Sequence, residues 1–348
     1  MRERKSPRKT HLFNGGNWMS HGEQVTRNVP AIMPSLPANA PSNRLGMAQW
    51  IVTTDHPLTA RVAVNRFWEQ IFGNGIVGTV ADFGTQGDKP THPALLDDLA
   101  VRFTTEQNWS VKALLKTFVM SATYRQQSNV TPALLEKDPQ NQLLARGPRY
   151  RLSAEQIRDQ ALSIGGLLSD KMYGPSVMPI QPDGVWAVVF SGAKWRTPNN
   201  EDRHRRGLYT YWRRTSPYPS MESFDAPSRE FCVTRRIRTN TPLQALVTLN
   251  DPGFVEAAQG LGKRMMTEGG GTVGDKLRYG FKLSISRMPT QPELRRMAML
   301  YKSEREYYDK HLPEAKAFSN AKDNASEAAT WTALANVLLN LDETLTRE

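Results

Sequence analysis

The sequence predicts a mainly α-helical protein: a helical bundle with a β/loop-rich insertion in the middle that is rich in arginine and aromatic residues. Apolar residues recur at helical spacing before residue 168, and helix-starting signals return after residue 241. The stretch between them has many Pro, Gly, Arg and aromatic residues and no helical period. We therefore expect an extended lead-in (1–42) and one large domain (43–348), made of a helical lobe (43–168), the β/loop-rich region (169–238) and a second helical lobe (239–348).

The first lobe is expected to hold three helices. One apolar stripe at positions i, i+3, i+4, i+7, i+8 and i+11 is formed by Ala60, Ala63, Val64, Phe67, Trp68 and Ile71. A second helix is expected from Pro93 to about Gln107. A third, with Ser110 as its N-cap, repeats the spacing at Val111, Leu114, Leu115, Phe118, Val119 and Ala122. Before this lobe, a proline every three to four residues favours an irregular chain.

Capping signals place the later helices. Ser153 with Gln156, Thr241 with Gln244, and Thr290 with Glu293 each have the spacing of a capping box. The last helix has an apolar stripe formed by Trp331, Leu334, Ala335, Leu338 and Leu341. In the middle region, residues 207–214 (GLYTYWRR) have the aromatic, Thr-containing composition of a β-strand, and 231–237 are a second strand candidate.

Charge and cysteine content narrow the class of protein. The 348 residues include 45 Lys+Arg and 34 Asp+Glu, a formal net charge of +11. Residues 1–10 contribute five cations and one acid, which is +4, so +7 remains on the rest. The single cysteine, Cys232, excludes an intramolecular disulfide and a zinc site built on several thiolates. Because Cys232 lies between Phe231 and Val233, we expect a buried structural thiol.

The sequence lacks the common cofactor and catalytic motifs. It has no GxxxxGK[ST], GxGxxG, GxSxG, HExxH or CxxCH pattern. The six histidines are dispersed, and His56 and His92, which precede prolines at expected helix starts, are assigned turn roles. We therefore expect no metal and no cofactor. Without a secretory signal or the ~18 uninterrupted apolar residues of a membrane span, the chain standing alone is expected in the cytoplasm.

The segment 195–238 is the one that could carry chemistry. It has ten Arg, no Lys and five acids, interleaved with Tyr and Trp. A guanidinium binds carboxylate, sulfate or phosphate through two hydrogen bonds and stacks on aromatic rings, which an ammonium does poorly. The composition therefore suits an anionic ligand with flat or ring-shaped surfaces. The residues expected to bind it are Arg206, Tyr209, Tyr211, Arg213, Arg214, Arg229 and Arg236.

Three interpretations of this segment stay open. The arginines could pair internally with the acids and stabilise a loop-rich region, as in a structural or partner-docking module. They could instead bind an anionic polymer, such as a sulfated or uronic-acid polysaccharide. Nucleic acid is disfavoured, because no helix-turn-helix, RNP or zinc-finger pattern accompanies the basic charge.

Catalysis by this segment would depend on a small set of acid/base groups. His204, Asp225 and Glu230 are the candidates for a hydrolase or lyase acting on such polymers, with Asp202 and Glu222 nearby. An Arg beside an Asp more often lowers the pKa of that carboxyl in a salt bridge than prepares it for catalysis. The spacing of these residues defines no specific catalytic motif.

Long motifs along the chain resemble one known family. They are residues 43–46 (NRLG), 57–62 (PLTARV), 65–68 (NRFW), 82–87 (DFGTQG), 121–126 (SATYRQ), 158–162 (RDQAL), 206–214 (RGLYTYWRR), 224–230 (FDAPSRE), 235–246 (RRIRTNTPLQAL) and 338–344 (LLNLDET). Together they resemble domain-of-unknown-function family 1553, a bacterial family enriched in planctomycetes, over nearly the whole chain.

The resemblance implies a cellular context rather than a reaction. In this family the domain usually forms the C-terminal part of large exported proteins, after a second domain of unknown function and often a cytochrome c-type domain. Export is thus implied, and a cytochrome c-type or companion domain on another chain is a possible partner. The family supplies no catalytic residues to carry over, and the haem-attachment motif is missing here.

Overall fold

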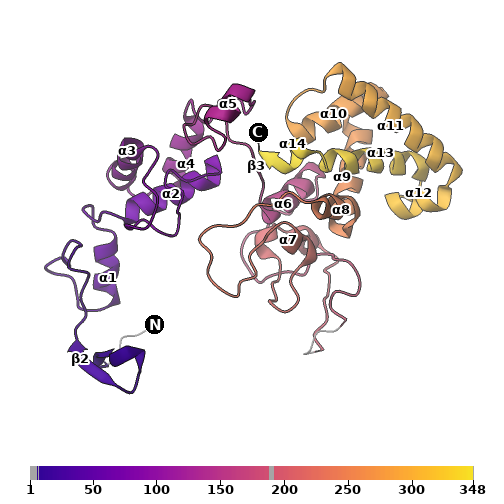
Figure 1. Ribbon diagram of the computed structural model, residues 1–348. Helices are drawn as coiled ribbons and strands as arrows, with labels where there is room; N and C mark the ends of the chain where they lie inside the picture. Colours follow the sequence, from indigo (N-terminus) through magenta and orange to yellow (C-terminus); the bar gives the residue numbers. More distant parts are fainter. Residues whose placement is uncertain (1–5, 7, 188–191, 348) are drawn as a thin grey trace. The chain divides into compact units, whose positions relative to one another are not determined.

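In the computed structural model the protein is mainly helical, as the sequence predicts. The structure describes residues 6, 8–187 and 192–347. The chain divides into two compact units, residues 1–148 and 149–348, and each is described here by itself (Figure 1). Most of the basic N-terminal tail, residues 1–5 and 7, lies outside the described residues. The division into a lead-in and one large domain stays a prediction.

The lead-in contains a hairpin that the proline pattern did not indicate. β1 (Thr10–Phe13) pairs antiparallel with β2 (His21–Val25), and a 3₁₀ turn, η1 (Asn14–Gly16), connects them. A first helix, α1 (Arg44–Ile51), which is not among the three predicted helices, follows near the predicted start of the large domain. Its N-cap is Asn43, whose side-chain oxygen accepts hydrogen bonds from two backbone N–H groups of the first turn.

The three predicted helices of the first lobe form the core of the N-terminal unit. They are α2 (Thr59–Phe72), α3 (Pro93–Thr104) and α4 (Val111–Met120), and a short helix, α5 (Pro132–Lys137), follows them. Their stripes meet in a cluster that buries Val64, Trp68, Phe103 and Phe118. The turn role of His56 is confirmed, because its Nδ1 accepts hydrogen bonds from backbone N–H groups at the start of α2.

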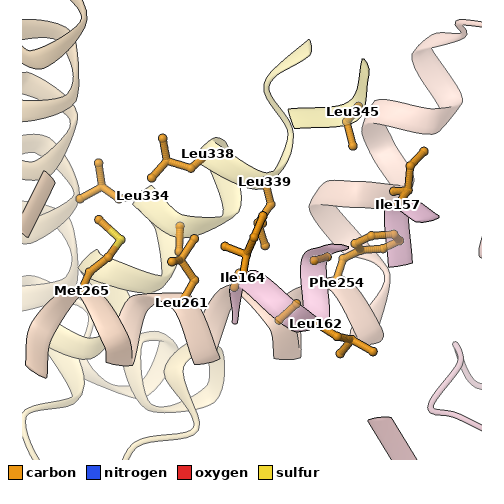
Figure 2. Close-up of a cluster of buried hydrophobic side chains, with 14 of the residues drawn as sticks. Ile157, Leu162, Ile164, Phe254, Leu261, Met265, Leu334, Leu338, Leu339 and Leu345 are labelled. Atoms are coloured by element: carbon orange, nitrogen blue, oxygen red, sulfur yellow. The ribbon is translucent and has the colours of Figure 1, made fainter. Parts of the chain in front are cut away.

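The core of the C-terminal unit is built on α6 (Ala154–Ile164), α9 (Pro252–Glu268) and α13 (Ala325–Leu339). Figure 2 shows their side chains interleaved, with Leu261 and Met265 of α9 facing Leu334 and Leu338 of α13. The surrounding helices are α8 (Pro242–Asn250), α10 (Val273–Ile285), α11 (Gln291–Lys310), α12 (Leu312–Ser319) and α14 (Asp342–Leu345). The capping boxes predicted before α6, α8 and α11 are all present.

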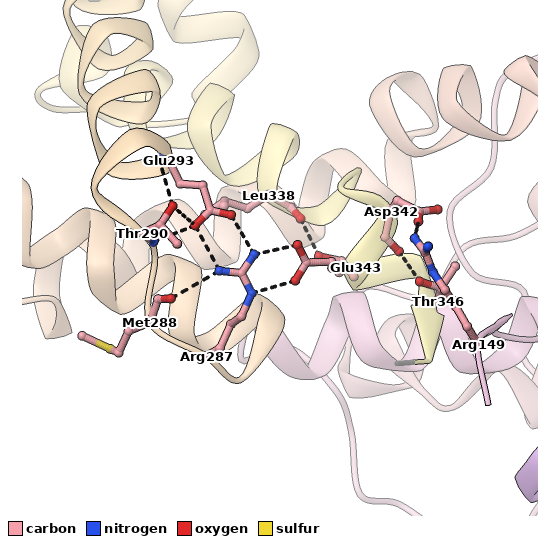
Figure 3. Close-up of polar contacts among 10 residues, drawn as sticks. Arg149, Arg287, Met288, Thr290, Glu293, Leu338, Asp342, Glu343 and Thr346 are labelled. Carbon is pink, nitrogen blue, oxygen red and sulfur yellow. Dashed lines mark hydrogen bonds and ion pairs between the residues drawn. The ribbon is translucent and has the colours of Figure 1, made fainter. Parts of the chain in front are cut away.

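The two ends of this unit meet. β3 (Tyr150–Arg151) pairs antiparallel with β4 (Thr346–Arg347). Beside the pair, Arg287 bridges Glu293 at the start of α11 and Glu343 in α14, while Arg149 bonds Asp342 (Figure 3). In the part of the chain that the structure describes, no helix is long and apolar enough to cross a membrane.

The middle region is loop-rich, as expected, but its two predicted strands are wrong. It contains η2 (Glu201–His204), η3 (Gly207–Tyr209) and α7 (Pro219–Ser223), and its described residues before η2 and after α7 are mostly irregular (Figure 1). Instead of starting a strand, Gly207 begins the 3₁₀ turn η3 and donates its N–H to the Asp159 carboxylate. No strand spans 231–237 either. Tyr211 packs on Trp186 and Tyr209 stacks with Arg205, whereas Phe231 is exposed.

Candidate functional site: an aromatic and cationic pocket

A pocket of about 840 Å³ opens in the middle region. Its walls are the chain segments 180–187 and 192–197, and Arg203 of η2 and Pro252, the first residue of α9, complete the lining. The first wall turns at Gly184, whose φ of 84° is in the left-handed region that glycine adopts without strain. Irregular chain therefore supplies most of the lining, and we call the side formed by Arg203 and Pro252 the base of the pocket.

Aromatic rings make one side of the pocket. Trp186 and Trp195 both line it, with ring centroids 5.2 Å apart, and Tyr211 lies 6.0 and 6.4 Å from them. Behind them, Trp195 stacks on Tyr218 at 5.8 Å and donates its indole N–H to the Pro179 carbonyl at 2.6 Å. These contacts hold the rings in place before any ligand arrives.

Tyr218 anchors this aromatic cluster to the folded core. Its side chain is buried, and its hydroxyl donates a 2.5 Å hydrogen bond to the Ile180 carbonyl. Burial raises the pKa of Tyr218 to about 12, so the phenol stays protonated and serves as a structural donor.

Cationic side chains lie in or next to the pocket lining. The guanidinium of Arg213 lies 5.3 Å from the ring centre of Trp186, and Lys194 and Arg203 line the pocket. One acid, Asp183, is also in the lining. Two lining atoms, Gln181 Oε1 and Trp186 Nε1, are buried without a hydrogen-bond partner among the described residues. The lining therefore combines flat apolar faces, positive charge and two polar atoms that have no hydrogen-bond partner among the described residues.

A charged network holds the base. Arg203 donates from Nε to both oxygens of Glu256, at 2.9 and 3.1 Å, and His204 Nε2 lies 3.2 Å from Glu256 Oε2. Burial alone would raise the pKa of Glu256, but hydrogen bonds from His204 and Arg203 outweigh it and hold the pKa below its usual value. Buried Arg158 adds a hydrogen bond to the Arg203 carbonyl at 3.2 Å. Glu256 thus holds the Arg203 side chain, and Arg158 holds its backbone.

Some of the predicted ligand residues lie elsewhere. Tyr209 accepts a hydrogen bond from the Tyr173 N–H at 2.7 Å and carries the guanidinium of Arg205 at 3.7 Å above its ring. Arg205 is buried and bonds backbone carbonyls, including that of Pro175. Arg206 and Arg214 are exposed, and neither lines the pocket.

The remaining candidates belong to the loop before α8. Asp225 accepts hydrogen bonds from the N–H and hydroxyl of Thr239, so its carboxylate joins the two ends of this loop. Arg229 lies 5.2 Å above the Trp212 ring, and Arg236 bonds Glu155 at 2.6 and 3.1 Å. Glu230 is exposed.

The structure therefore brings Tyr211, Arg213 and, at the base, His204 near one pocket, with Glu256 rather than Asp225 or Glu230 beside the histidine. Sequence reasoning missed Trp186 and Glu256. Glu256 had a signal, because it is a charged residue within the apolar sequence of α9.

The expectation of a buried cysteine is wrong. Cys232 is exposed, and so are its neighbours Phe231 and Val233, whose apolar character suggested a core. Within residues 6, 8–187 and 192–347, no group of three or more His, Cys, Asp or Glu side chains could hold a metal ion.

The chain is thus a mainly helical domain with a loop-rich middle region that is rich in arginine and aromatic residues and contains a pocket. A family model described as "PSD1: Protein of unknown function (DUF1553)" matches residues 43–301, and the chain belongs to this family. No curated protein and no solved structure matches the chain.

Proposed function

We propose that this domain binds an anionic polysaccharide, of the sulfated or uronic-acid type, in the pocket between segments 180–187 and 192–197. The observation that carries the proposal is that Trp186 lines the pocket and has the guanidinium of Arg213, which lies next to the lining, 5.3 Å from its ring centre. A sugar ring offers a flat face for stacking, and its sulfate or carboxylate suits a guanidinium. Lys194 supplies further positive charge in the lining, whereas the charge of Arg203 is paired with Glu256.

The pocket suits a sugar unit better than a compact anion. Its volume of about 840 Å³ falls in the range of small-molecule sites, which are mostly apolar with a few placed polar groups. A single phosphate or sulfate would leave the faces of Trp186 and Trp195 uncovered. A polymer unit can occupy the aromatic wall and the cationic groups at once.

The test is affinity electrophoresis of the full chain in gels containing polygalacturonate, dextran sulfate or neutral dextran. Wild-type protein is expected to be retarded by an acidic polymer at low salt but not by dextran. Arg213→Ala should weaken binding roughly tenfold or more, since a hydrogen bond to a charged group contributes about 1.5–3 kcal/mol. Trp186→Ala should also weaken binding, because it removes a flat face on which the sugar ring stacks. Added salt should weaken the interaction, because exposed charges are screened over about 10 Å.

Tyr173→Ala is the matched control, because Tyr173 is an exposed aromatic residue outside the pocket. It should leave retardation unchanged. Absence of retardation in both acidic gels, or an equal loss in Tyr173→Ala and Trp186→Ala, would rule out this assignment of the pocket.

A second candidate function is hydrolysis of the same polymers or, for the uronic-acid type, β-elimination. It is favoured by the contact between His204 Nε2 and Glu256 Oε2, because a carboxylate that holds one imidazole nitrogen fixes the orientation of the ring for proton transfer at the other. His204 directly follows Arg203, which lines the pocket. Asp225 and Glu230 have no part in this version.

If this version holds, wild-type protein should release oligosaccharides from polygalacturonate or dextran sulfate. His204→Ala should reduce that rate by about 10²–10⁴-fold, the usual contribution of a general acid or base, while retardation in the gel persists. Glu230→Gln serves as the control and should keep full activity. A wild-type chain that binds the polymers without cleaving them would leave binding as the function.

A further inference from the structure

The loop between Asp225 and Thr239 lies outside the pocket and exposes apolar side chains. We call residues 228–238 the basic loop; no helix or strand spans it. Phe231, Val233 and Ile237 are 70%, 43% and 76% exposed. Leu243 and Leu246 on the following helix α8 are also more than half exposed. Large apolar side chains gathered in one exposed stretch, rather than scattered singly, mark an interaction surface.

The base of the basic loop is pinned. The Asp225 carboxylate receives the Thr239 N–H at 2.7 Å and its hydroxyl at 2.8 Å. Buried Gln244 donates to the Thr239 hydroxyl and to the Ser223 carbonyl, both at 3.0 Å. The two ends of the loop are therefore held side by side on the start of α8.

Contacts made by the basic loop itself also hold it in place. Trp212 donates its indole N–H to the Ser228 carbonyl at 3.2 Å and lies under the guanidinium of Arg229. Further along, Arg236 makes two hydrogen bonds to Glu155 in α6. The polar side chains thus connect the loop to the body of the unit, while Phe231 and Ile237 stay open to solvent.

The charge of the basic loop indicates which kind of surface it binds. Residues 228–238 contain four Arg (Arg229, Arg235, Arg236 and Arg238) and one acid, Glu230. Apolar side chains flanked by arginines suit a surface with negative charge outside and hydrocarbon beneath. We infer that the basic loop docks the protein onto an anionic lipid bilayer, with Phe231 and Ile237 inserted below the headgroups.

A lipid surface fits better than a groove on another protein. A protein interface relies on a packed, shape-complementary core, whereas the exposed apolar side chains of this loop lie on irregular backbone without a helix or strand to present them. A fluid bilayer needs no such complementarity, because its binding strength depends on buried apolar area and on attraction to anionic lipids.

A dye attached to Cys232 would report directly on insertion of the basic loop into a bilayer. It is the only cysteine of the chain, it is exposed, and it adjoins Phe231. A polarity-sensitive dye on Cys232 of the full chain is expected to shift to the blue when vesicles of equal parts phosphatidylglycerol and phosphatidylcholine are added. Vesicles of phosphatidylcholine alone should produce little shift. The same dye on Cys232→Ser/Ser303→Cys, on the exposed side of α11, should not respond.

Sedimentation of the unlabelled chain with the same vesicles separates the two contributions. Phe231→Ser/Ile237→Ser should reduce the partition constant between solution and vesicles at least roughly tenfold, because two apolar side chains are lost. Arg235→Gln should reduce it roughly fivefold, the value for one cation near an anionic surface. The matched controls are Met288→Ser/Leu312→Ser, which removes two exposed apolar side chains elsewhere in the unit, and Arg295→Gln on α11. Both controls should bind as wild type.

The inference fails if wild-type protein ignores phosphatidylglycerol vesicles, or if Phe231→Ser/Ile237→Ser binds them as well as wild type. It also fails if that double variant instead abolishes a concentration-dependent dimer in vesicle-free solution, because the loop would then be an interface between copies of the chain. Loss of polysaccharide retardation in the Trp186 variant leaves this result untouched, so the two proposals are tested independently.

Discussion

Trp331→Ala is expected to lower the free energy of unfolding of the C-terminal unit by about 3–5 kcal/mol, the range for removing a large buried aromatic side chain. Trp331 of α13 is 0% exposed. Its ring lies 4.8 Å from that of Tyr301 in α11, and its backbone approaches Gly262 of α9 so closely that a Cβ there would be 3.0 Å from the Trp331 carbonyl carbon. Close packing on both sides leaves little room for the cavity to collapse.

Trp331→Phe separates ring packing from hydrogen bonding. The indole Nε1 of Trp331 is buried without a partner in the described part of the chain, so the smaller ring also removes an unpaired donor. The phenylalanine variant should therefore lose less than half as much stability as the alanine variant. Urea unfolding followed by circular dichroism measures both, and an equal loss in the two variants would contradict the role given to packing.

Arg287→Ala is expected to cost the C-terminal unit about 2 kcal/mol at neutral pH. Arg287 bonds both Glu293, at 2.7 and 3.0 Å, and Glu343, at 2.6 and 2.8 Å (Figure 3). Removing it leaves two carboxylates facing each other. Because the Arg287 and Glu293 side chains are 38% and 29% exposed, solvent screening keeps the cost below the ~3–5 kcal/mol of a fully buried pair.

The same contact predicts a dependence on acid. Hydrogen bonds from Arg287, with smaller help from Thr290, lower the pKa of Glu293 from 4.5 to about 2. The carboxylate therefore stabilises the fold fully above pH 4.5, and this stabilisation is lost as the pH falls from 4.5 towards 2. Arg287→Ala should make the free energy of unfolding depend less on pH between 4.5 and 2.

Arg278→Ala is the matched control for this prediction. Arg278 is similarly exposed but contacts a single carboxylate, Asp275, within the same helix. Such a pair contributes about 0.3–0.5 kcal/mol. Urea unfolding at a series of pH values compares the two variants, and an unchanged acid slope in Arg287→Ala would contradict the coupling of Arg287 to Glu293.

Helices were predictable because their signals are local. The capping box of Ser153 and Gln156, and the apolar stripe from Ala60 to Ile71, involve residues within a few turns of one another, and both are present in the structure. The strand predicted at 207–214 was wrong because its cue was composition alone. There, Tyr211 packs on Trp186 and Arg205 stacks on Tyr209, contacts that depend on loops distant in sequence.

The pocket could be located only in part for the same reason. Tyr211 and Arg213 were found from the Arg/aromatic composition, but Trp186 lies before that segment, and Glu256 lies in a helix that begins after it. Cys232 shows the opposite error. Its apolar neighbours predicted burial, whereas the hydrogen bonds of Asp225 and Arg236 hold the backbone of this segment in an exposed loop.

The pairing of β3 with β4 has a consequence for synthesis on the ribosome. Tyr150 pairs with Arg347, and α6, near the start of the C-terminal unit, packs in a core completed by α13 and Leu345. Residues 149–348 must therefore nearly all emerge before this unit can close, which takes roughly 10–40 s at ~5–20 residues per second. During that interval the apolar face of α6 stays exposed, because α13 has not yet been synthesised. A nascent chain halted before α13 should therefore be the form most dependent on chaperones.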